Sequence, residues 1–192
     1  ARYQIFEDSL LIAMARHSAA PSRQARINGV LYGWDDRGSG RPVLFLHGLF
    51  LNRQFWTPLT DRMGTGKRLV TFDMPGHGVS GWRDGFDLDG IADDLALWIA
   101  ENGATPATIV GHSQGGMIAL RLAIRHPHAV ERLVVVNSSA RAEYPERLGA
   151  WRNRRAALLD EGARHGALSE IQRMTTAPGW VKAHPGEAAS ER

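Results

Sequence analysis

The chain has 192 residues, enough for one domain with a sizeable core, and its 43% apolar and 22% charged residues are ordinary for a globular protein. It contains no cysteine, which excludes disulfides, thiolate catalysis and thiolate metal sites and favours a cytoplasmic location. The formal net charge is only +3, and the arginines are interleaved with acids apart from Arg152, Arg154 and Arg155, so the sequence indicates no nucleic-acid partner.

Residues 1–23 are expected to be an N-terminal extension. Their apolar run, Leu10–Ala15, is too short to span a membrane and follows two acids, so it predicts neither a membrane helix nor a signal peptide. An appended helix and a loosely attached segment both remain open interpretations.

From Ala25 onward, segments typical of strands alternate with segments typical of helices. Arg26–Tyr32 and Tyr32–Asp36 suggest a strand pair near a sheet edge, and Asp35–Gly40 is expected to form a turn. This alternation predicts an α/β fold with a mostly parallel sheet and helices on both faces. Core strands are expected at Pro42–Leu46, Arg68–Phe72, Ala107–Gly111 and Arg132–Asn137. Helices are expected at Asn52–Met63, where Phe55, Trp56, Leu59 and Met63 fall at helical spacing, at Asp87–Asn102, which Asp87 caps, and at Gln114–Arg125.

After Asn137 the pattern changes to helices alone. Pro145 is expected to open a helix that stops near Gly162, and Ser169 to cap a second, short helix. No further strand is predicted before Arg192. We therefore divide the chain into the extension, a core over residues 24–141 and a helical segment over residues 142–192.

The segment Ile109–Gly116 carries the strongest chemical signal. A predicted strand runs into Gly-His-Ser-Gln-Gly and then into a predicted helix, which is the context of a nucleophile elbow around Ser113. The flanking glycines leave room for a tight turn, and the helix start offers unpaired N–H groups to a developing oxyanion. The alternative is a glycine-rich turn that only allows close packing.

Three motifs, in this order, resemble the α/β-hydrolase superfamily, and the resemblance covers about Ala25–Arg141. They are Leu44–Phe50 with its His-Gly pair, Asp73–Ser80, and the Ser113 elbow. The resemblance implies that Ser113 is the nucleophile and that the backbone N–H groups of Leu49 and Gln114 form the oxyanion hole.

The resemblance also assigns supporting roles to neighbouring residues. His47 and His77 are expected to tie loops together through hydrogen bonds, with Gly48 beside His47 in the oxyanion loop. His112 is expected to line or support the site. Asp73 is interpreted as a turn-former rather than as the catalytic acid, because it precedes Ser113 in the chain.

The catalytic acid and histidine that should follow Ser113 are not found in this chain. Glu143 and His184 are weak candidates for them. His126 and His128 follow the helix after Ser113 and are expected at the opposite end of the sheet, while His165 falls in the helical tail.

The simplest explanation is a C-terminally truncated α/β-hydrolase core that lacks its last strands, followed by the start of a helical cap. The implied activity is hydrolysis of a small carboxylic ester or lactone through an acyl-enzyme on Ser113, as in esterases and enol-lactonases, with weak or no activity without the base. No metal or organic cofactor, nucleic acid or membrane is implied. The alternative is a non-catalytic fragment or binding module that retains the pocket. Self-association, or a missing C-terminal partner segment, is expected from the unfinished sheet.

Overall fold

The computed structural model describes residues 23–85, 87–141 and 145–175. The chain divides into two compact units, Ala1–Ala140 and Arg141–Arg192. The expected extension lies outside the described residues, except that Arg23 begins the first strand. Within the described ranges, no helix combines the length and apolar composition needed to cross a membrane.

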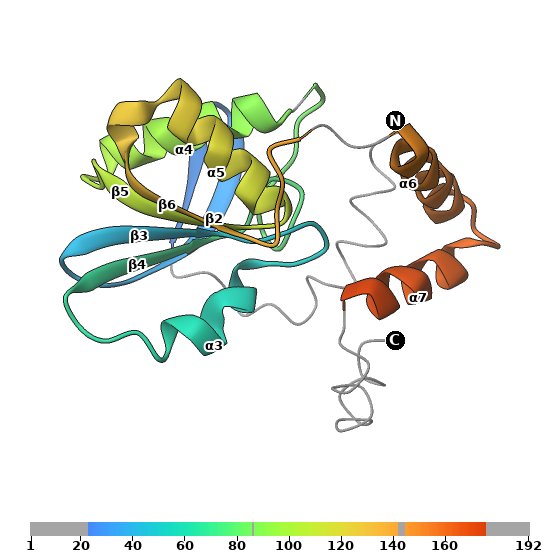
Figure 1. The fold of residues 1–192 in the computed structure, drawn as a ribbon, viewed down its shortest axis with the longest axis horizontal. Helices are drawn as coiled ribbons and strands as arrows, with labels where there is room; N and C mark the ends of the chain where they lie inside the picture. The colour runs from blue at the N-terminus through green and yellow to red at the C-terminus, as the bar shows by residue number, and fades with distance from the viewer. Residues whose placement is uncertain (1–22, 86, 142–144, 176–192) are drawn as a thin grey trace. The chain divides into compact units, whose positions relative to one another are not determined.

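The first unit is built on one six-stranded sheet in the order β1-β2-β4-β3-β5-β6 (Figure 1). Four neighbouring strands, β4, β3, β5 and β6, are parallel to one another. β2 runs antiparallel to both of its neighbours, β4 and β1. This confirms the predicted α/β class with a mostly parallel sheet. The strands are β1 (Arg23–Ile27), β2 (Val30–Gly38), β3 (Arg41–Leu46), β4 (Lys67–Phe72), β5 (Ala107–His112) and β6 (Val130–Val136).

Two boundaries expected from the sequence differ in the structure, one at each end of β2. The expected strand Arg26–Tyr32 is interrupted by a turn at Asn28 and Gly29, whose φ angles of 47° and 83° are those of the tight turn that Asn-Gly favours. The expected turn at Asp35–Gly40 begins only at Gly38, because β2 continues to that residue in register with β4.

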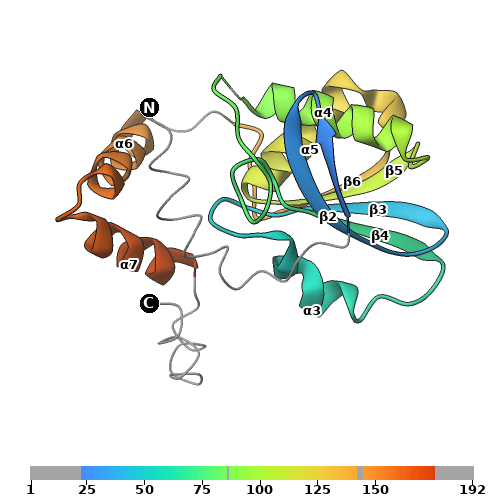
Figure 2. The same cartoon turned by 180° about the vertical axis from the view of Figure 1, so that it is seen from behind.

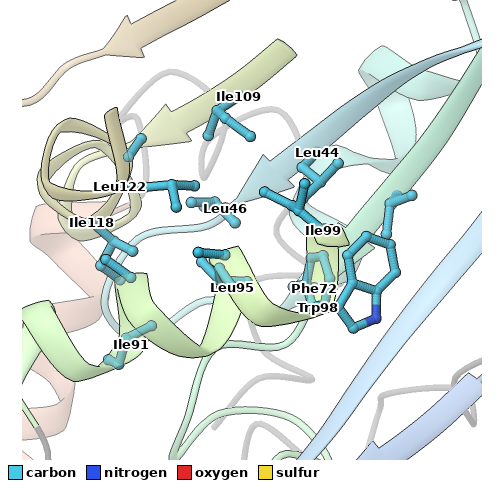
Figure 3. Packing of buried hydrophobic residues seen from close by; sticks show 14 of the residues in the cluster. Leu44, Leu46, Phe72, Ile91, Leu95, Trp98, Ile99, Ile109, Ile118 and Leu122 are labelled. Atoms are coloured by element: carbon cyan, nitrogen blue, oxygen red, sulfur yellow. The ribbon is translucent and has the colours of Figure 1, made fainter. Parts of the chain in front are cut away.

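One face of the sheet is covered by α4 (Leu88–Glu101) and α5 (Gln114–Arg125) (Figures 1 and 2). Asp87 caps α4 by accepting the Gly90 N–H, as its position in the sequence predicted. Figure 3 shows the core that results, where side chains from both helices meet those of the central strands. It includes Leu44, Leu46, Phe72, Ile91, Leu95, Trp98, Ile99, Ile109, Ile118 and Leu122.

The other face carries a shorter helical segment than the sequence suggested. The predicted helix Asn52–Met63 is instead a 3₁₀ turn, η1 (Arg53–Trp56), followed by the single turn α3 (Thr57–Thr60). Trp56 is buried against the sheet, whereas Phe55 and Leu59 are 40% and 46% exposed. The expected apolar face therefore does not form, because the shorter segment turns only part of it toward the sheet.

The second unit contains α6 (Pro145–Leu159) and α7 (Arg164–Thr175). The start of α6 at Pro145 agrees with the sequence, but α7 begins five residues before Ser169, so Ser169 lies inside the helix and does not cap it. Arg154 on α6 donates to Glu170 on α7 at 2.9 Å, which joins the two helices.

Candidate active site

Ser113 lies where β5 passes into α5, at the carboxyl end of a central strand. Its φ and ψ angles are 51° and −115°, a backbone conformation that residues other than glycine rarely adopt. The strained turn predicted from Gly-His-Ser-Gln-Gly is therefore present. The side chain is half-buried.

Hydrogen bonds hold the backbone of this strained residue on both sides. The Ser113 N–H donates to the carbonyl of Val136, at the end of β6, at 3.0 Å. Its own carbonyl accepts the N–H groups of Gly116 and Met117 at 3.0 and 3.2 Å, and the hydroxyl of Ser138 at 2.6 Å. Ser138 had no assigned role in the sequence, because its contact depends on how β6 ends beside the elbow.

The loop after β3 packs directly against the elbow. A Cβ on Gly115 would overlap the carbonyl oxygens of Leu46 and His47, and one on Gly48 would lie 2.9 Å from His112 Nδ1. The glycines at positions 48 and 115 thus allow two backbone segments to approach more closely than any side chain would permit.

This packing brings the two predicted oxyanion donors into neighbouring segments, one in the loop after β3 and one at the first residue of α5. Among the described residues, the N–H groups of Leu49 and Gln114 make no hydrogen bond. The first N–H groups of a helix have no acceptor within it and lie at the positive end of its dipole.

Two histidines connect the loop after β3 with the loop after β4. His47 Nε2 accepts the N–H of Met74 at 2.9 Å, while His77 Nε2 accepts the N–H of Phe50 at 3.3 Å. Burial lowers the pKa of the His47 imidazole well below its ordinary value, and burial also lowers the pKa of His77. Both rings are thus neutral at pH 7, as an accepting Nε2 requires. Their expected role in tying loops together matches these contacts.

Asp73 is fully buried at the start of the loop after β4, and its carboxylate makes hydrogen bonds within the fold. Its carboxylate accepts the backbone N–H of Arg53 and of Val79, and it pairs with the Arg53 guanidinium at 2.8 Å. These partners agree with its interpretation as a turn-former.

His112, beside Ser113, has an aromatic neighbour that the sequence did not identify. The Phe55 ring packs on the imidazole with centroids 4.8 Å apart. His112 Nδ1 is buried and has no hydrogen-bond partner in the described residues, and burial lowers the pKa of this imidazole. The sequence placed Phe55 within a longer helix and gave it no role at the site, and the contact follows from the observed 3₁₀ turn.

No described residue completes a catalytic triad. Within the described ranges, the Ser113 hydroxyl makes no hydrogen bond to a histidine or carboxylate, and no group of three metal-ligating side chains is present. His126 follows α5 and binds Asp93 of α4 at 2.7 Å, at the end of α5 opposite Ser113. His165 is on α7 of the second unit. The weak candidates Glu143 and His184 lie outside the described residues.

Comparisons with known proteins agree with this architecture. A family model described as "alpha/beta hydrolase fold" matches residues 41–176. The chain is 38% identical over 114 residues to a pimeloyl-acyl carrier protein methyl ester esterase of Neisseria meningitidis, covering 57% of this chain and 43% of that protein. The chain spans 32–43% of the length of the first curated relatives it matches.

Solved structures show the same sheet. A thermophilic esterase from Thermogutta terrifontis aligns with a TM-score of 0.74 and 26% identity, covering 88% of this chain and 65% of that one. The enol-lactonase from Burkholderia xenovorans LB400 aligns with a TM-score of 0.78 at 21% identity over the same shares, a likeness that concerns the fold.

Proposed function

The chain belongs to the α/β-hydrolase family, and from this membership we propose that it carries the nucleophile and oxyanion-binding half of a serine hydrolase. The observation that carries the proposal is the strained backbone of Ser113 at the strand–helix turn, packed against the loop that holds Leu49. Strain of this kind persists only where surrounding contacts enforce it, and it gathers at functional sites.

The proposed reaction is acyl transfer from a small carboxylic ester or lactone. The Ser113 oxygen forms a bond to the carbonyl carbon, the π electron pair moves onto the carbonyl oxygen, and the Leu49 and Gln114 N–H groups stabilise the resulting oxyanion. Collapse expels the alcohol oxygen, which takes up the proton that Ser113 loses. Water then cleaves the acyl-enzyme and restores the hydroxyl. The ester-hydrolase names of the Neisseria and Thermogutta proteins support this substrate class.

The proton acceptor for Ser113 is not assigned to any described residue. In a comparable triad, loss of the base lowers turnover by on the order of a millionfold, and the oxyanion hole and substrate binding supply the residual catalysis. We therefore expect this chain, by itself, to turn over esters slowly.

The test uses the full chain and a p-nitrophenyl ester, whose phenolate leaves without needing a proton. The expected result is slow turnover above the buffer rate that Ser113→Ala removes, with both proteins showing the same melting temperature within error. Equal rates for the two proteins would refute Ser113 as the nucleophile. Fast turnover that depends on Ser113 would instead reveal a working base, and His184→Ala and His165→Ala would then identify it.

A second candidate function is a non-catalytic binding module. The observation in its favour is that, in the described part of the chain, no base contacts the Ser113 hydroxyl. A binding module predicts reversible binding of an ester analogue with no acylation of Ser113 detectable by mass spectrometry. Covalent acylation of Ser113 would decide against it.

A further inference from the structure

Ser138 makes a contact that links the segment after β6 to the proposed oxyanion hole. Its hydroxyl donates to the Ser113 carbonyl oxygen at 2.6 Å. From this contact we propose that Ser138 is a positioning residue, which sets the direction and strengthens the polarity of the Gln114 N–H. The proposal rests on the function proposed above and assigns a residue to its oxyanion-binding step.

The argument follows from the geometry of one peptide group. The Ser113 carbonyl and the Gln114 N–H belong to the same planar unit, and in a trans peptide they point in opposite directions. A hydrogen bond that fixes the carbonyl therefore fixes the N–H on the other side. Because hydrogen bonds in a chain polarise one another, a donor on the oxygen also makes the N–H a stronger donor.

The Ser113 carbonyl does not need Ser138 in order to be satisfied. It already accepts the N–H groups of Gly116 and Met117 from the first turn of α5. Both of these bonds come from the helix, whereas the Ser138 hydroxyl comes from a separate segment and adds a third donor. The Ser138 hydroxyl therefore affects the orientation and polarity of the Ser113–Gln114 peptide group, and it is not needed to satisfy the carbonyl.

The surrounding backbone is arranged to deliver this hydroxyl. A Cβ on Gly116 would lie 2.5 Å from the Ser138 Cβ, so only glycine at position 116 leaves space for it. Asn137 has a φ angle of 47°, a left-handed turn between the two residues that hold Ser113. On one side of this turn, the Val136 carbonyl accepts the Ser113 N–H. On the other side, the Ser138 hydroxyl donates to the Ser113 carbonyl.

The experiment measures phosphonylation of Ser113 in the full chain by an alkyl fluorophosphonate. The Ser113 oxygen forms a P–O bond as the P–F bond breaks, and fluoride and the serine proton leave. Negative charge grows on the phosphoryl oxygen in the same hole. We expect Ser138→Ala to lower the limiting labelling rate about fivefold, the effect of one hydrogen bond, with the half-saturating probe concentration unchanged. Ser138→Thr keeps the hydroxyl and should recover most of the rate.

A control separates positioning from loss of stability. Tyr32→Phe removes a buried hydroxyl that donates to Asp94 at 2.8 Å, in a network between β2 and α4 with no contact to the elbow. It should destabilise the fold at least as much as Ser138→Ala while leaving the labelling rate at the wild-type value. A parallel fall in rate for Tyr32→Phe would overturn the positioning role.

A spectroscopic measurement tests the same contact without any reaction. The ¹⁵N resonance of Gln114 reports donation to the preceding carbonyl and should shift upfield in Ser138→Ala and little in Ser138→Thr. An unchanged Gln114 resonance, or wild-type labelling of Ser138→Ala while Ser113→Ala stays unlabelled, would overturn the inference and leave the proposed function intact. If the wild-type chain is not labelled at Ser113 even at alkaline pH, where hydroxide takes the serine proton in place of a base, the proposed nucleophile fails and the inferred catalytic role of Ser138 fails with it.

Discussion

His47 and His77 hold each other's loop in place. Their rings meet edge to face with centroids 5.1 Å apart, and each Nε2 accepts a backbone N–H from the loop that carries the other histidine. These bonds therefore hold the loop on both sides of Leu49, at His47 two residues before it and at Phe50 directly after it. The conformation of the loop after β3 therefore depends on two uncharged imidazoles.

Acid should therefore destabilise the fold between about pH 6.5 and pH 5, where unfolded histidines protonate and most carboxyl groups do not. The pKa values of both imidazoles are lowered in the folded state, so the unfolded chain binds more protons here. The free energy of unfolding is expected to be highest above pH 6.5 and to fall by up to about 1.4 kcal/mol per pH unit for each histidine. Urea unfolding at several pH values measures it. His77→Gln should reduce the slope, and a flat profile would contradict the prediction.

Breaking the buried ion pair of Asp73 should cost far more than breaking a surface pair of similar length. Arg53 and Asp73 are 2.8 Å apart and nearly inaccessible, whereas Arg37 and Asp61 are 2.7 Å apart and about half exposed. Asp73→Asn removes the fully buried carboxylate of the pair, leaves the Arg53 guanidinium with the partly exposed Asp35 at 2.9 Å, and is expected to lower the free energy of unfolding by about 3 kcal/mol. Asp61→Asn should cost less than about 1 kcal/mol. Equal losses in denaturant titrations would show that burial of the pair is not what matters.

Two glycine-to-alanine changes should shift the free energy of unfolding in opposite directions. Gly115→Ala places a methyl group against the Leu46 and His47 carbonyls, so the loop after β3 or α5 must shift. A loss of at least about 2 kcal/mol, together with loss of labelling at Ser113, is expected. Gly149→Ala on α6 meets nothing within 4 Å and should raise helix stability by about 0.5–1 kcal/mol. Thermal and chemical unfolding check both. A Gly115→Ala protein with wild-type stability would contradict the close approach.

Ser113→Gly should be more stable than Ser113→Ala by about 1 kcal/mol, which reverses the usual order of these residues. Alanine keeps the Cβ that is strained at a φ of 51°, and glycine removes it. Both variants lack the hydroxyl and should lose ester turnover alike, so the difference isolates the backbone strain. Melting temperatures measured side by side decide the order. Alanine as the more stable of the two would show that the turn relaxes without cost.

The β6 edge should promote self-association. β6 is the last strand of the described sheet, and Val134, Val135 and Val136 are each at least 40% exposed. Unpaired backbone groups beside apolar side chains are a template for another strand. Sedimentation velocity of the wild-type chain should show concentration-dependent larger species, and Val135→Lys should reduce them. A monomer at all concentrations would contradict this expectation.

Much of the first unit could be predicted because its signals are local. The apolar runs of the core strands and the Asp87 cap placed these elements to within about two residues. The helix after Ser113 was placed correctly at both ends. The sequence placed Asp35 and Asp36 both at the end of a strand and in a turn, and pairing with β4 keeps them in the strand, which is information that the residues themselves do not carry.

In the candidate site, too, some residues could be predicted from local sequence and others could not. Ser113 belongs to one motif, and His47 and Gly48 belong to another, and both motifs can be recognised along the chain. Ser138 and Phe55 are ordinary residues in the sequence, and they reach the site only because β6 ends beside the elbow and the segment after Asn52 is a 3₁₀ turn. No periodicity or spacing encodes such contacts between segments.

The approach of Gly116 to Ser138 has a consequence for protein engineering. In a chimera that takes α5 from one homologue and the segment after β6 from another, positions 116 and 138 would come from different parents. A side chain at 116 and a hydroxyl-bearing residue at 138 compete for the same space. Crossover points for recombination should therefore lie before Gly111 or after Ser139, so that the elbow and the residue that contacts its carbonyl are inherited together.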